Sequence, residues 1–88
     1  MNREYKLASI EPYDELDSVV VTFTRDGVRR VFFHGGTIVV SFNKHGDISE
    51  VEFIEASRVD RQRLTREVGL LNAKNRARLE FSLDAVSP

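Results

Sequence analysis

The 88-residue sequence has no cysteine, no tryptophan and only two prolines, and it lacks a long apolar run. Without cysteine the chain has no disulfide, no thiolate metal ligand and no cysteine nucleophile. Its aliphatic runs, such as residues 19–21 and 38–40, are far shorter than the roughly 20 residues that span a membrane. The first residues also lack the apolar stretch of a signal peptide. We therefore expect a cytoplasmic protein that does not associate with membranes.

The length and the charge distribution limit the organisation further. A chain this short has room for one hydrophobic core, so we expect a single domain over residues 1–88. The net charge is −1, but residues 58–78 contain seven Lys/Arg and two Asp/Glu, whereas residues 1–57 contain six and ten. The basic segment is either a solvated helix face or a docking surface for an acidic partner, and both readings stay open.

The stretch from Ser18 to Glu55 has strand periodicity. Apolar residues alternate with polar ones or form short β-branched blocks, and turn residues interrupt them at three places. The predicted strands cover residues 18–24, 28–34, 37–42 and 48–55. Each intervening turn contains glycine, which accepts the positive φ of tight hairpins. The pattern predicts an antiparallel four-stranded β-meander.

The turn at residues 43–46 resembles a type I turn with a glycine bulge, which predicts a register for the last two strands. The predicted pairs are Phe42 with Ile48, Val39 with Val51, and Thr37 with Phe53. In this register Ile38, Val40, Phe42 and Ile48 share one face, and Val39, Val51 and Phe53 share the other. Both faces of the sheet are then apolar, and both need a cover.

The rest of the chain predicts one helix and one more strand. Ser57 begins a capping-box pattern, and Leu64, Val68 and Leu71 follow at helical spacing, which predicts a helix over residues 58–71 that bends or ends near Gly69. Alternation of Leu79, Phe81 and Leu83 with polar residues predicts a strand after Asn75, with a continued helix as the alternative. The predicted fold class is α+β.

Two segments carry a resemblance to a known family. They are Tyr13-Asp14-Glu15-Leu16-Asp17-Ser18-Val19-Val20-Val21-Thr22-Phe23 and the stretch from Gly36 through Asn43-Lys44-His45-Gly46-Asp47 to Glu55-Ala56-Ser57. Together they cover about half of the chain and resemble domain of unknown function 2283, a family of short prokaryotic proteins. The resemblance implies a meander fold, no catalytic residue, and small proteins as partners, including toxin-like neighbours. The chain departs from the family in its basic turn and in the segment after Ser57.

The residues themselves indicate no enzyme. His34 and His45 border turns at opposite ends of the third predicted strand, about 20 Å apart at roughly 3.3 Å per residue, too far for a shared metal ion. The carboxylates Asp47, Glu50, Glu52 and Glu55 form the polar positions of a strand, a pattern typical of a solvated edge. No nucleophile elbow or phosphate-binding loop is present. We expect no catalytic residue, no metal and no cofactor.

Two functions remain from the sequence. The first is a non-enzymatic protein-interaction domain, a homodimer in which a second copy or a small protein partner covers the exposed sheet face. Its candidate interface residues are Val39, Val51, Phe53, Leu79 and Phe81. The alternative is a nucleic-acid-associated regulator or antitoxin-like protein that uses residues 58–78. Its candidate phosphate contacts are Arg58, Arg61, Arg63, Arg66, Lys74, Arg76 and Arg78.

Overall fold

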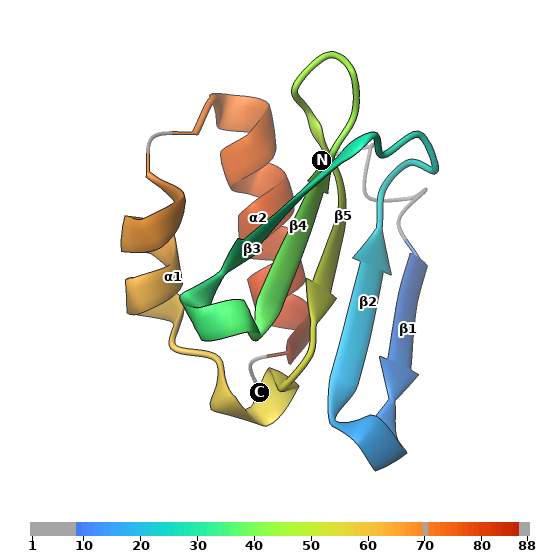
Figure 1. The fold of residues 1–88 in the computed structure, drawn as a ribbon, viewed down its shortest axis with the longest axis vertical. Helices are drawn as coiled ribbons and strands as arrows, with labels where there is room; N and C mark the ends of the chain where they lie inside the picture. Colours follow the sequence, from blue (N-terminus) through green and yellow to red (C-terminus); the bar gives the residue numbers. More distant parts are fainter. Residues whose placement is uncertain (1–8, 70, 87–88) are drawn as a thin grey trace.

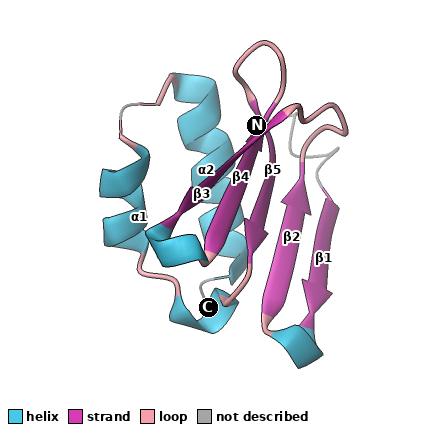
Figure 2. Cartoon of the chain, viewed as in Figure 1, coloured by secondary structure: helices cyan, strands magenta, loops and turns pink. Residues whose placement is uncertain are grey.

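A computed structural model describes residues 9–69 and 71–86. The fold is α+β, with a five-stranded antiparallel sheet followed by two helices on one of its faces (Figure 1). The strands are β1 (Ser9–Tyr13), β2 (Ser18–Thr22), β3 (Arg29–Phe33), β4 (Ile38–Phe42) and β5 (Ile48–Phe53). The helices are α1 (Arg61–Val68) and α2 (Ala73–Val86), and short 3-10 turns cover residues 14–16, 34–36 and 56–58 (Figure 2).

The four predicted strands exist, but the prediction of a simple meander is wrong. The sheet order is β1-β2-β5-β4-β3, so β2 pairs with β1 and β5, and it does not pair with β3. The connection from β2 to β3 passes across the β4–β5 hairpin, which gives a Greek key. Gly27 in this connection is close to the hairpin, because a Cβ there would lie 2.7 Å from Ser49 Oγ. Gly27, which was predicted to form a hairpin turn, therefore allows the connection from β2 to β3 to pass close to the β4–β5 hairpin.

A short sequence repeat underlies this order. Residues 19–27 (VVVTFTRDG) match residues 38–46 (IVVSFNKHG), and the matching strands β2 and β4 flank β5 in the same register. Val19 and Ile38 both pair with Phe53, and Val21 and Val40 both pair with Val51. Equivalent β-branched residues thus pack on either side of β5.

The predicted register of the β4–β5 hairpin is correct at its first pair and wrong beyond it. Phe42 pairs with Ile48, but Val40, and not Val39, pairs with Val51. The shift arises at a bulge beside Ser41, which leaves Ser49 out of the ladder. Ser49 O instead accepts hydrogen bonds from Phe23 N and Thr24 N, at 2.8 and 3.1 Å. The bulge moves Val51 and Phe53 to the same face as Phe42.

The core therefore lies on one face of the sheet, beneath the helices. Its sheet side consists of alternate residues of β2, β4 and β5, and its helix side of three leucines. The buried members are Val21, Phe23, Ile38, Val40, Phe42, Ile48, Val51, Phe53, Leu64, Leu79 and Leu83. The prediction that Val39, Val51 and Phe53 make the other face apolar is wrong, because only Val39 of the three lies there.

The predicted helix is shorter than expected. It begins after Asp60, whose side chain accepts a hydrogen bond from Arg63 N at 3.1 Å, and it ends at Gly69, where φ is 78°. Ser57, the expected cap, donates its backbone N–H and its hydroxyl to the Asp17 carboxylate instead. This contact connects the turn before β2 to the segment after β5.

The predicted C-terminal strand is wrong, because residues 73–86 form the helix α2. Its buried residues are Asn75, Arg78, Leu79, Ser82 and Leu83, which follow helical spacing. Three of these five are polar, so the buried stripe has no apolar periodicity that the sequence could reveal. Leu79, Phe81 and Leu83 alternate with polar residues only by coincidence, and Phe81 lies at the margin of the core, edge-on to Phe23 at 5.8 Å between centroids.

Near the bulge, polar side chains of α2 form hydrogen bonds with backbone groups of β5 and of the turn before it. Asn75 Oδ1 accepts from Ile48 N at 2.7 Å, and Asn75 Nδ2 donates to Gly46 O at 2.9 Å. Arg78 Nη1 donates to Ile48 O at 2.6 Å, and its guanidinium lies over the Phe23 ring. Ile48 N, Ile48 O and Gly46 O thus find their partners in side chains of the helix.

Candidate interaction surface

The face of the sheet opposite the helices is open and mainly polar. It carries Glu11 and Tyr13 from β1, Val20 and Thr22 from β2, Glu50 and Glu52 from β5, Val39 and Ser41 from β4, and Arg30 and Phe32 from β3. Arg30 Nη2 lies 2.9 Å from Glu52 Oε1. The carboxylates outnumber the cations on this face, which opposes the binding of phosphates.

A hollow of about 510 Å³ occurs on this face, with Tyr13, Thr22, Arg30, Ser41 and Glu50 among its lining residues. The lining contains no histidine, and its one hydroxyl bonded to a carboxylate is that of Thr24, which donates to Asp26. The hollow can therefore accept polar groups of a partner, but its residues do not form a catalytic set.

The strand β3 forms one edge of this sheet, and it exposes apolar side chains. Phe32 is 64% exposed, and Val28, just before the strand, is 70% exposed. Phe32 lies beside Val39 of β4, which is buried at 2% exposure. A strand edge with exposed apolar residues is a template for pairing with another strand.

The two edges of the sheet differ in chemistry. The opposite edge, β1, contains Pro12, which cannot donate a hydrogen bond to an added strand. The strand β3 has neither a proline nor a bulge. Of the described edges, β3 is therefore the one whose backbone is open to pairing.

The predicted interface residues do not form a surface. Val51 and Phe53 are fully buried and Leu79 is 3% exposed, all three beneath the helices, and Phe81 is half-buried on α2. Val39 alone lies on the open face. The prediction of this interface depended on a register that the bulge changes and on a C-terminal strand that is instead the helix α2. The exposed strand β3 was missed because a meander would place residues 28–34 between two other strands.

Most of the predicted phosphate contacts have partners within the chain. Four ion pairs join Arg58 to Glu55, Arg61 to Asp84, Arg63 to Glu67, and Lys74 to Asp47, at 3.2, 2.7, 3.6 and 3.5 Å. Arg78 is buried against β5. Within the described ranges, Arg66 and Arg76 are the two of the seven whose side chains form no ion pair or hydrogen bond. The structure therefore does not bring the seven together as one basic surface.

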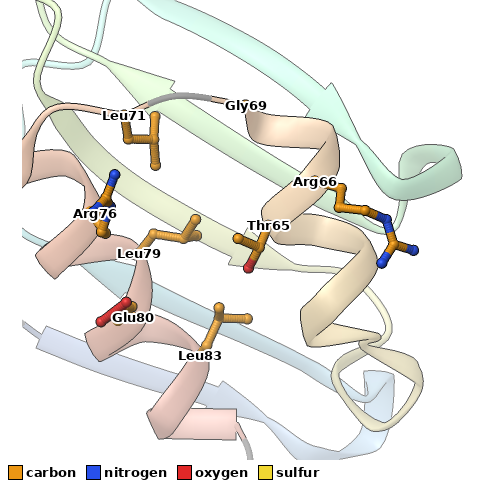
Figure 3. Close-up of a pocket in the computed structure, with 8 residues that line it drawn as sticks. All are labelled: Thr65, Arg66, Gly69, Leu71, Arg76, Leu79, Glu80 and Leu83. Carbon is orange, nitrogen blue, oxygen red and sulfur yellow. The ribbon is translucent and has the colours of Figure 1, made fainter.

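A groove of about 530 Å³ lies between α1 and α2, lined by Thr65, Leu71, Leu79 and Leu83 among others (Figure 3). Figure 3 shows the three leucines between the helices, whereas the Arg66 side chain extends away from them. Leu79 and Leu83 are almost fully buried. The groove is a shallow apolar seam without polar groups that converge on a ligand.

The turn residues near Asp26 and Asn43 interact with each other. Thr24 donates a hydrogen bond to the Asp26 carboxylate, and this bond lowers the pKa of Asp26, with further lowering by Asn43 and by the charge of His45. Asn43 Oδ1 accepts from His45 N and Asp47 N at 2.9 and 3.0 Å, which shapes the β4–β5 turn. Over residues 9–69 and 71–86, no group of three His, Asp or Glu residues is arranged to hold a metal ion.

No family model, curated protein or solved structure matches the chain. The likeness to domain of unknown function 2283 thus depends on the residues quoted above. No helix among the described residues has the length and apolar character needed to cross a membrane. The surface chemistry of the molecule is therefore the basis for a functional proposal.

Proposed function

We propose that this chain is a non-enzymatic protein-interaction domain that forms a homodimer, in a cytoplasmic setting. The observation that supports it best is the edge strand β3, which has neither a proline nor a bulge and exposes Phe32, with Val28 exposed just before it. The sequence predicted a homodimer for another reason, namely that both faces of the sheet are apolar. In the structure Val51 and Phe53 belong to the core, and of the residues expected on the other face only Val39 lies there. A small protein partner at the same edge is a variant of this proposal.

The nucleic-acid alternative has weaker support. Five of its seven candidate cations are ion-paired or buried, and the open face that exposes Tyr13 and Phe32 also carries Glu11, Glu50 and Glu52. Stacking of bases on this face would bring phosphates towards carboxylates. Arg66 and Arg76 are too few to produce the steep salt dependence of a phosphate-binding surface.

Sedimentation equilibrium across a micromolar concentration series tests the proposal. We expect the weight-average mass to rise from that of one chain towards that of two. A short duplex and a single strand, added at about 50 and 200 mM salt, should leave the mass unchanged. A single-chain mass at all concentrations would refute the homodimer. Micromolar nucleic-acid binding that falls steeply with salt and is lost in Arg66→Glu/Arg76→Glu would favour the alternative.

A further inference from the structure

The hydrogen-bond pattern of the sheet defines which backbone groups of β3 face outwards. Ile54 N donates to Thr37 O at 2.7 Å, so Thr37 faces the β5 side, and alternate residues of β4 share its direction. Val40 and its alternate neighbours therefore face β3, where Val40 pairs with Val31. It follows that Val31 bonds inwards, and that the N–H and C=O groups of Arg30 and Phe32 face outwards.

We propose that this outer edge pairs antiparallel with β3 of a second copy, about a two-fold axis at Val31. The inference depends on the proposed homodimer and specifies its contact. Arg30 of each copy then lies opposite Phe32 of the other, and each such pair exchanges two backbone hydrogen bonds. All four outward-facing groups of each copy gain partners, and the two sheets become one continuous ten-stranded sheet.

The side chains favour this register over its neighbours. A pairing centred on Arg30 would place two guanidinium groups opposite each other, which is unfavourable. A pairing centred on Phe32 would bring Arg30 opposite His34, which lies outside the strand in a 3-10 turn. A pairing centred on Val31 uses all five strand residues and places each cation opposite an aromatic ring.

The exposed side chains of β3 are suited to that arrangement. The Arg30 side chain is 59% exposed, and it shares the open face with Phe32. A guanidinium against a phenyl ring of the neighbouring strand is a favourable cation–π pair. On the other face, Val31 meets Val31 of the second copy beside the margin of the core. The sequence Arg-Arg-Val-Phe-Phe is thus self-complementary when it runs antiparallel to itself.

Disulfide trapping tests the register, because the chain has no native cysteine. An equimolar mixture of Arg30→Cys and Phe32→Cys chains should form a mixed disulfide on mild oxidation, since hydrogen-bonded partners have Cα atoms about 5.5 Å apart. Each variant alone should form far less. Val31→Cys, which keeps both Arg30 and Phe32, should crosslink to itself. Leu16→Cys, exposed on the turn between β1 and β2, is the matched control and should form no disulfide crosslink.

The outcomes separate this inference from the proposed function. Efficient self-crosslinking of Arg30→Cys, with none in the mixture, would overturn the register. A dimeric mass without crosslinking in the mixture or in Val31→Cys would overturn the edge pairing, while the homodimer proposal stands. A single-chain mass and no crosslinking would overturn both. Thermal unfolding of each reduced variant shows whether it is folded.

Discussion

Replacement of Asn75 by alanine should lower the free energy of unfolding by about 1–3 kcal/mol, because it leaves one buried and one part-buried backbone group without their partner. The groups are Ile48 N and Gly46 O, which the Asn75 side chain bonds at 2.7 and 2.9 Å. Urea unfolding followed by circular dichroism measures the change as a lower midpoint with an unchanged slope.

Lys74→Ala is the matched control for Asn75→Ala. Lys74 lies next in the chain and contacts the same turn through Asp47, but its side chain is about half exposed. A surface ion pair contributes only about 0–1 kcal/mol, so this variant should unfold close to the wild type. Equal losses for the two variants would contradict the role given to Asn75 in holding the bulge.

Replacement of Phe53 by alanine should cost about 3–5 kcal/mol, the range for a fully buried phenylalanine. Phe53 pairs with Val19 on one side and Ile38 on the other, and it is fully buried beneath the helices. Removal of its ring would leave a cavity at the centre of the core. Thermal unfolding should show a large fall in the melting temperature.

Phe32→Ala is the control for Phe53→Ala, because it removes the same side chain from the exposed edge of β3. At a concentration low enough to keep the chain monomeric, it should change the free energy of unfolding by no more than about 0.5 kcal/mol. A large loss for Phe32→Ala, or a small one for Phe53→Ala, would mean that the two faces of the sheet are assigned incorrectly.

The strands could be predicted from the sequence because local chemistry defines them. Glycine-containing turns and β-branched blocks located β2 to β5 within two residues. The meander correctly makes β4 the neighbour of both β3 and β5. The pairing of β2 could not be predicted, since Gly27 has the same local appearance in a hairpin turn and in a connection that crosses two strands. The bulge at Ser49 was equally hidden, because its stabilising partners come from Asn75 and Arg78, nearly thirty residues away.

The candidate surface was unpredictable for the same reason. Whether Phe32 is exposed depends on the sheet order, which places β3 at an edge, and no property of the residues around Phe32 indicates that position. A helix after Asn75 was only the alternative to a strand, because the buried side of α2 carries Asn75, Arg78 and Ser82, whose polarity conceals the helical period. In both cases, contacts between residues far apart in the sequence determine the local structure.

Amide hydrogen exchange at Arg30 and Phe32, measured by NMR at low and high protein concentration, tests the pairing of β3 most directly. Val31 N–H, which bonds inwards to β4, is the internal reference and should be protected at both concentrations. The account predicts that Arg30 and Phe32 exchange fast in the dilute monomer and become protected as the concentration rises. Fast exchange of these two amides in a sample shown to be dimeric would contradict it.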